Sequence, residues 1–331
     1  MLAAFRTLIS LLVVLAVIVG IAAWQARQVY RAPGPLPEAR TIVIPRGGIE
    51  GIAAALERQG VIADTRGFAI AAWLTRGQGA LRSAEYTFPA HASMADVLDV
   101  LREGKAVQRR LTIPEGLTAR QIAAIMARTE GMTGEAPVPE EGAVLPETYS
   151  YQWGDNRAAL LRRGETAMTQ ALATVWADRA PGLPLSNPRD LLVLASIVEK
   201  ETGTAAERAR VAGVFVNRLK RGMPLQSDPT VAYVAGQGMP LERPITRADL
   251  DRDSPFNTYR NKGLPPGPIA SPGLAALRAT ARPAATDDLF FVADGTGGHA
   301  FARTLEEHNR NVTRWRGIEQ QRRGSPAAPQ R

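Results

Sequence analysis

The chain has 331 residues, 45% of them hydrophobic, which suffices for two domains of ordinary size. It has no cysteine, which excludes disulfide scaffolds and thiolate metal sites, and its three histidines (His91, His299, His308) match no metal-ligand spacing. The formal charge of +8 favours an acidic partner, such as nucleic acid, anionic lipid or an anionic wall polymer. We expect neither a metal nor a cofactor.

An apolar run without charge or proline lies near the start of the chain, from Thr7 to Trp24. At ~1.5 Å per residue a helix of this length spans ~27 Å, close to the ~30 Å hydrocarbon core of a bilayer. The alternative is a cleaved signal peptide, but the run exceeds the usual signal core of ~7–15 residues and no clear A-x-A site follows it. We therefore expect residues 7–25 to form a membrane anchor, preceded by a short terminus at 1–6. The flanking arginines are too balanced to set its orientation.

Two further segments lack the pattern of a folded domain. Residues 26–40 end in the proline-rich stretch Arg31–Arg40, which indicates a stiff spacer. Residues 320–331 are polar and basic without an apolar period, which predicts a disordered tail.

A strand, a turn and an amphipathic helix recur three times after the spacer. The strands end at residues 44, 88 and 113, and apolar stripes follow at 52–56, 97–101 and 122–126. Ser93 and Thr118 stand where helix N-caps belong. The subdomain at 41–110 resembles the LysM glycan-binding module. The alternative is a small α+β packing unit that binds no sugar, and these residues alone do not separate the two.

A larger, mostly helical domain is predicted over residues 111–319. Asn187 and Pro188 indicate a helix start, and the helix continues through an apolar stretch at 191–198. Residues 204–207 have the pattern of a capping box that opens a second helix ending at Gly222, so the two helices should form a hairpin. Residues 289–301 predict a β-hairpin, and Thr304 a cap for the last helix. The predicted fold class is α+β, with an N-terminal transmembrane helix and two domains.

Glu199, at the end of the first of these helices, is the candidate catalytic residue. It shares a face with Leu192 and Ala195, so its carboxyl should emerge at the edge of an apolar core, where desolvation raises its pKa above the ~4.3 reference. Such a group stays protonated and can give a proton to a glycosidic oxygen. Glu201 lies about 200° around the helix and should face away. The alternative is that both glutamates belong to a solvated helix end.

Several separate motifs resemble the endolytic murein transglycosylase family, described as YceG-like. The resemblance covers nearly the whole chain and implies that Glu199 is the catalytic acid/base. Ser271 departs from the family pattern, which usually has Asn or Thr before Pro-Gly. We interpret Ser271 as an N-cap followed by Pro272, a change that should leave the chemistry unaffected. The motifs, in chain order, are LASIVEKET at 194–202, VFVNRL at 214–219, LQSDPTV at 225–231, NTY at 257–259, GLPPGPIA at 263–270 and FVADGTGGH at 291–299.

The resemblance implies a lytic transglycosylase, a carbon–oxygen lyase that cuts the β-1,4 bond between N-acetylmuramic acid (MurNAc) and N-acetylglucosamine (GlcNAc). Cleavage leaves a 1,6-anhydroMurNAc end and limits nascent strand length. The resemblance further implies a single-pass protein of the inner membrane whose catalytic domain lies outside the cytoplasm, in the periplasm. The implied partners are peptidoglycan glycan strands and the cytoplasmic membrane, with peptidoglycan synthases as candidates.

Polar residues outside the helical hairpin are candidates for substrate binding, because they offer carboxyl, amide, hydroxyl and aromatic groups. For each of them, capping or turn formation is an equally good interpretation. They are Glu147, Gln226, Ser227, Asp228, Asn257, Thr258 and Tyr259.

Three other functions remain open from the sequence. A muramidase-type hydrolase would need a second carboxylate facing Glu199, for which Asp228 and Glu147 are candidates. A non-catalytic, membrane-anchored peptidoglycan-binding protein would act through the repeated unit instead. A nucleic-acid-binding protein is disfavoured by the anchor and by the lack of a basic stripe interleaved with aromatic residues, so we expect no nucleic acid partner.

Overall fold

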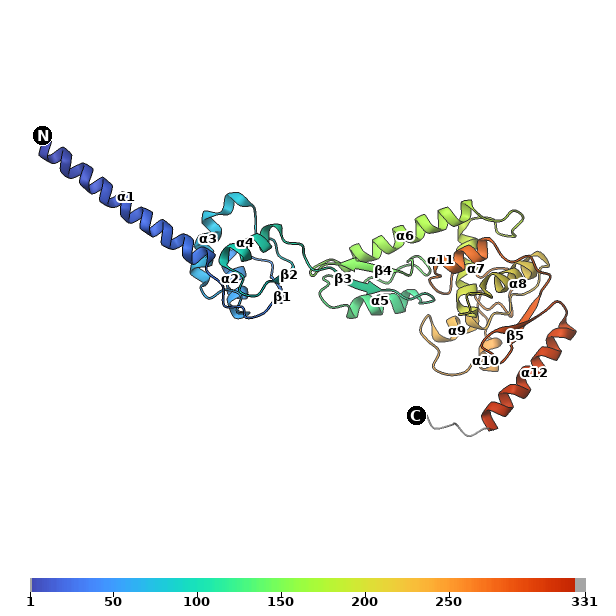
Figure 1. Cartoon of the computed structure of the whole chain (residues 1–331). Helices are drawn as coiled ribbons and strands as arrows, with labels where there is room; N and C mark the ends of the chain where they lie inside the picture. Colours follow the sequence, from blue (N-terminus) through green and yellow to red (C-terminus); the bar gives the residue numbers. More distant parts are fainter. Residues whose placement is uncertain (1, 325–331) are drawn as a thin grey trace. The chain divides into compact units, whose positions relative to one another are not determined.

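The computed structural model describes residues 2–324, which divide into two compact units (Figure 1). Unit 1 comprises residues 2–109 and 150–154, and unit 2 comprises residues 110–149 and 155–324. The mixture of helices with small two-stranded sheets confirms the α+β class in this general form.

Unit 1 begins with one long helix, α1, over Leu2–Arg31, drawn in blue in Figure 1. Its segment Ile9–Arg31 is long and apolar enough to cross a membrane, and its most apolar stretch is not buried inside the structure. Leu11 and Val17 are both more than half exposed. The helix continues past residue 25, where the anchor was expected to end, and it contacts α4 of the same unit.

The rest of unit 1 packs two copies of the strand–helix repeat around one apolar core. Strands β1 (Arg40–Val43) and β2 (Glu85–Phe88) pair antiparallel. The predicted stripes on α2 (Ile49–Arg58) and α4 (Met94–Glu103) are buried, which confirms their assignment. Ser93 caps α4 in a reciprocal box with Asp96, also as predicted. Between the copies lies α3 (Thr65–Leu74), followed by a short 3-10 turn at Arg76–Gln78, neither of which the sequence analysis identified.

The proline-rich stretch expected to be a spacer packs onto unit 1 instead. Leu36 is fully buried in the core. The backbone N–H of Gly34 donates to His91, and His91 donates back to Leu36. A Cβ on Gly34 would lie 2.1 Å from the carbonyl oxygen of Ala92, so only glycine allows this close approach.

Unit 2 holds the helix of the third repeat. Its strand β3 (Arg109–Thr112) pairs with β4 (Thr148–Tyr151) rather than with β1 or β2. Helix α5 (Ala119–Arg128) is capped by Thr118 in a reciprocal box with Gln121, as predicted. The 21-residue helix α6 (Arg157–Ala177) follows.

The core of unit 2 is formed by α7 (Pro188–Glu201), α8 (Arg208–Lys220) and α11 (Leu274–Ala281). Helix α7 contacts both of the others, which confirms the predicted helical hairpin. Asn187 caps α7 by accepting the N–H of Asp190, again as predicted. Two short helices, α9 (Asp228–Gly236) and α10 (Arg247–Leu250), complete this region.

Two predicted caps are wrong. Thr204 and Glu207 form no capping box, because His299 engages both carboxylate oxygens of Glu207. The backbone N–H of His299 binds one oxygen, and its Nδ1 binds the other. Ser271 caps no helix either, since Gly273 is the N-cap of α11. The backbone N–H of Ser271 instead donates to Leu117, which ties the segment before α11 to the turn before α5.

The described part of the chain ends in a two-stranded sheet and a long helix. Strands β5 (Phe290–Ala293) and β6 (His299–Ala302) pair antiparallel, and α12 (Leu305–Gly324) contacts β5. Thr304 accepts the N–H of Glu307 as predicted. Residues 320–324 continue α12, where the disordered tail was expected to begin, and residues 325–331 lie outside the described residues.

Candidate active site

Glu199 lies in the last turn of α7, and its side chain is only 7% exposed. Its Oε2 accepts the backbone N–H of Gly273, at the start of α11, over 3.0 Å. Its Oε1 lies 4.0 Å from Nη2 of Arg208, the first residue of α8. The carboxyl group is therefore held between the N-terminal end of α11, which carries partial positive charge, and the guanidinium of Arg208.

The pKa of Glu199 is raised above the ordinary value of a glutamate. Burial is the main cause, and repulsion from the carboxylate of Glu115 adds to it. The N–H of Gly273 and the charges of Arg208 and Lys200 lower the pKa and offset part of this effect. The site thus favours the protonated acid and also contains groups that stabilise its ion.

Glu115, in the turn before α5, brings a second carboxylate to this site. It is exposed, and a Cβ built on Gly273 would lie 1.7 Å from its Oε1. The turn is held by the backbone N–H of Gly116, which donates to Ser271. Glu147 and Asp228 were the residues predicted for such a role, and Glu115 was not predicted. No local motif marks it, because its position depends on pairing between segments far apart in the chain.

Glu201 enters a different polar network, as its position around the helix predicted. Its Oε1 accepts the hydroxyl of Ser227. Burial raises the pKa of Glu201 to about 7; the bond from Ser227 and the charge of Arg218 act against this rise, and Asp228 adds to it. The guanidinium of Arg218 is fixed by the carbonyl oxygens of Leu225 and Leu289. This second carboxyl group with a raised pKa was not predicted from the sequence.

The structure brings six of the seven predicted substrate-binding residues into one cluster with this network. The backbone N–H of Ser227 donates to the hydroxyl of Thr258, and Gln226 donates to its carbonyl oxygen. The hydroxyl of Tyr259 donates to Asp228. Gln226 and Asp228 are exposed, whereas Ser227 and Thr258 are at most 2% exposed. The seventh residue, Glu147, is exposed at the start of β4 and belongs to none of these contacts within residues 2–324.

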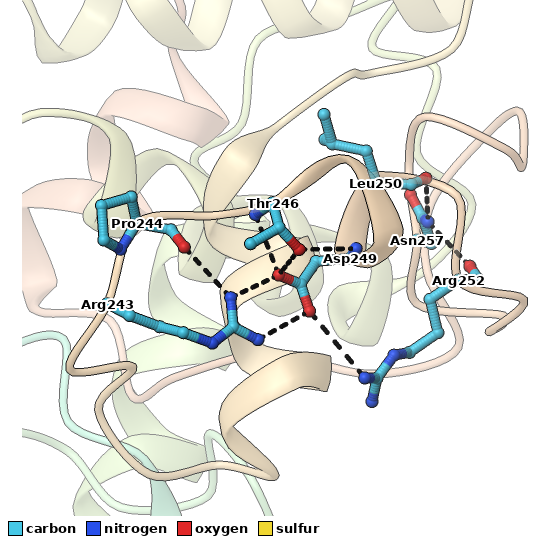
Figure 2. A network of polar contacts seen from close by, with 7 residues as sticks. All are labelled: Arg243, Pro244, Thr246, Asp249, Leu250, Arg252 and Asn257. Carbon is cyan, nitrogen blue, oxygen red and sulfur yellow. Dashed lines mark hydrogen bonds and ion pairs between the residues drawn. The ribbon is translucent and has the colours of Figure 1, made fainter.

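A buried charge holds the loop before this cluster (Figure 2). Asp249 is 3% exposed and accepts hydrogen bonds from Arg243 and Thr246, and the bond from Arg243 is the first cause of its lowered pKa. Asn257, 1% exposed, closes the other end of the loop. Its amide donates to the carbonyl oxygens of Leu250 and Arg252 at 2.9 Å each.

A pocket of about 330 Å³ adjoins the cluster. It is lined by Lys200 and Asp228, by Thr118 and Gln121 from the start of α5, and by Tyr233 of α9, together with apolar side chains. Lys200 lines this pocket, whereas the adjacent Glu199 is not among its described lining residues. Hydroxyl, amide, charged and aromatic groups around one hollow are suited to binding a sugar. Within residues 2–324 no group of acidic or histidine side chains is placed to hold a metal ion.

Comparison with known proteins identifies relatives over most of the chain. The model of the YceG-like family matches residues 42–314. The endolytic murein transglycosylase of Bacillus subtilis is 38% identical over 172 residues, 52% of this chain and 47% of that protein. Its namesake from Streptococcus pneumoniae is 32% identical over 321 residues, 82% of this chain and 57% of that protein. The chain thus spans about half the length of the curated relatives it matches.

The comparison of structures agrees with this result. The crystal structure of a YceG-like protein from Listeria monocytogenes matches with a TM-score of 0.54 at 30% identity. The match covers 82% of this chain and 98% of the Listeria chain.

Proposed function

The chain belongs to the YceG-like family, and from that premise we propose that it is an endolytic lytic transglycosylase acting on the glycan strands of peptidoglycan. Two of its relatives carry this activity in their names. The observation that carries the proposal is the environment of Glu199, an enclosed glutamic acid with a raised pKa held by Gly273 and Arg208.

Two proton transfers by Glu199 complete the proposed reaction. The carboxyl group gives its proton to the bridging oxygen between MurNAc and GlcNAc as the bond from that oxygen to C1 breaks. The C6 hydroxyl of the same MurNAc then bonds to C1 and returns a proton to the carboxylate. The products are a 1,6-anhydroMurNAc end and a free GlcNAc hydroxyl. No water is consumed, so a second carboxylate is not needed to activate one.

The contacts of Glu199 suit both protonation states of this cycle. Because Gly273 binds Oε2, we assign the transferred proton to Oε1. Burial favours the acid that begins the reaction. The charge of Arg208 and the N-terminal end of α11 favour the ion that exists between the two transfers.

We assign the glycan contacts to Gln226 and Asp228, the exposed members of the polar cluster, to the half-buried Tyr259, and to the pocket beside them. Ser227, Asn257 and Thr258 are buried and bonded within the chain, which supports a positioning role for these three. Glu147 stays a candidate contact on its exposure alone.

A hydrolytic muramidase is the second candidate, because Glu115 places a carboxylate close enough to raise the pKa of Glu199. In that reaction Glu115 would activate a water molecule. Digestion of purified glycan strands by the full-length protein in detergent separates the two functions. Product masses lower by one water than those of reducing ends support the transglycosylase, whereas reducing ends support the hydrolase.

We also propose that α1 is a single-pass anchor in the inner membrane, with unit 2 and the rest of unit 1 in the periplasm where the substrate lies. Its uncovered apolar length supports the anchor. The membrane and the glycan strands are then the partners, with peptidoglycan synthases as candidates. Residues 41–110 are the proposed LysM-like glycan-binding module. Protease treatment of intact cells and of cells with a permeabilised outer membrane tests the orientation, because digestion only after permeabilisation is expected.

A further inference from the structure

Helix α3 of unit 1 is apolar on two faces, and only one of them is buried. Phe68 and Ala72 face the core and are at most 2% exposed. Ile70, Trp73 and Leu74 are 61%, 56% and 66% exposed. Their spacing of three and four residues places them on one side of the helix. Large apolar side chains gathered on one exposed face mark a contact surface.

This exposed face continues onto the end of α1. A pocket of about 590 Å³ is lined by Ile70 and Leu74 of α3 and by Ala26, Val29 and Tyr30 of α1. Val29 is itself 67% exposed. A mainly apolar surface therefore joins the end of the proposed membrane anchor to α3.

The position of α3 along α1 matches the surface of a bilayer. Trp24 ends the apolar run, and Val29 and Tyr30 lie ~7–9 Å farther along the helix at ~1.5 Å per residue. The headgroup layer of one leaflet is ~5–8 Å thick, because this is half the difference in thickness between the whole bilayer and its hydrocarbon core. Since α3 shares a pocket with this part of α1, it would lie at the level of the headgroups, from which the apolar face of an interfacial helix reaches the ends of the acyl chains.

Basic side chains border the same surface. Arg27 of α1 is exposed and lines the pocket. The guanidinium of Arg76 stacks over the ring of Trp73, with its carbon atom 4.4 Å from the ring centroid. The acidic side chain in the pocket lining, Asp64, is engaged as the N-cap of α3. Tryptophan with flanking arginines is typical of protein segments at an anionic membrane interface.

We propose that the outer face of α3 docks onto the lipid surface beside the anchor, with Ile70, Trp73 and Leu74 among the acyl chains and Arg27 and Arg76 at lipid phosphates. The proposal rests on the proposed anchoring of α1 but not on the proposed cleavage reaction. Unit 1 then has two membrane contacts, which restrict its rotation about the end of α1.

The absence of cysteine from the sequence allows a direct test by site-specific spin labelling. The full-length chain is reconstituted in vesicles of phosphatidylglycerol and phosphatidylcholine, with one labelled cysteine at a time. Leu74→Cys reports on the docking face, Leu15→Cys on the anchor, and Ala54→Cys on an exposed position of α2 in the same unit. Collision of each label with oxygen, which concentrates in lipid, is compared with collision with a water-soluble nickel chelate.

We expect oxygen to dominate at Leu74→Cys and Leu15→Cys, and nickel to dominate at Ala54→Cys. A lipid-embedded label at position 15 with a nickel-accessible label at position 74 overturns the docking and leaves the anchor intact. A label at position 74 shielded from both reagents also overturns it, because a protein rather than lipid then covers the face. A water-exposed label at position 15 overturns the anchor and the docking together.

Discussion

The backbone N–H of Gly273 donates to Oε2 of Glu199 over 3.0 Å and joins the start of α11 to the end of α7. The φ angle of Gly273 is −74°, which any residue adopts, so backbone conformation does not require glycine here. Space favours glycine instead, because a Cβ at this position would clash with the carboxyl group of Glu115 unless that side chain moved. This contact couples the three residues.

Replacement of Glu115 should change the pH dependence of cleavage. The first step needs protonated Glu199, so kcat/KM falls as pH rises through the pKa of this group. Glu115→Gln removes a charge that raises this pKa, and the descending limb should move to lower pH. Arg208→Gln removes a charge that lowers the pKa, and the limb should move to higher pH. If the descending limbs of both variants stayed at the wild-type pH, a group other than Glu199 would control the fall of kcat/KM.

Gly273→Ala should reproduce the effect of Glu115→Gln. The new methyl group clashes with the flexible end of Glu115 and would displace it, at a cost to stability below about 1 kcal/mol. The pH limb should therefore move to lower pH, and the double variant with Glu115→Gln should move no farther than either single one. Gly203→Ala, where nothing lies within 4 Å of the added Cβ, is the control. Fully additive shifts would refute this coupling.

Two buried serines should respond oppositely to alanine. Ser196 donates its hydroxyl to Val193 and accepts the N–H of Ile269, so Ser196→Ala leaves a buried donor unsatisfied and should cost about 1–3 kcal/mol. The hydroxyl of Ser271 is buried with no hydrogen-bond partner among residues 2–324, so Ser271→Ala should cost nothing or stabilise. Chemical denaturation measures both, and equal losses would be inconsistent with these contacts.

Glu201 should make stability fall as pH rises. Its pKa is about 7 in the folded chain and ~4.3 in an unfolded one, so the folded state binds more protons between these values. The contribution of Glu201 to stability is then highest below pH ~4.3, declines up to about pH 7 and is constant above that pH. Glu201→Gln removes the titration. Its midpoint of thermal unfolding, relative to wild type, should be higher at pH 8 than at pH 5, and a constant difference would exclude the raised pKa.

The sequence sufficed wherever the determinants lie within one helical turn. Ser93, Thr118 and Asn187 are caps whose partners stand three residues away, and all three were predicted. That the side chains of Glu199 and Glu201 point to different sides of α7 followed from helix geometry alone. The catalytic role of Glu199 was predicted from the family resemblance, which rests on several motifs in a fixed order. Hydrophobic periodicity carries no such information.

The predictions failed where a distant segment competes for a side chain. Glu207 has the right spacing for a capping box, but His299 engages its carboxylate. Ser271 precedes proline as an N-cap would, but its backbone is bonded to Leu117. Glu115 became part of the site through the same pairing. Such contacts depend on tertiary structure, and a single sequence carries no local signal for them.

The two glutamates of α7 allow the most direct test of the proposed chemistry. Glu199→Gln and Glu201→Gln are the same substitution two residues apart, in separate networks. Full-length variants in detergent are incubated with purified glycan strands, and product masses are recorded after circular dichroism has shown that both are folded. We predict anhydro ends from wild type and Glu201→Gln, and a rate lower by about 10²–10⁴-fold from Glu199→Gln. Cleavage by Glu199→Gln at the wild-type rate would contradict the account.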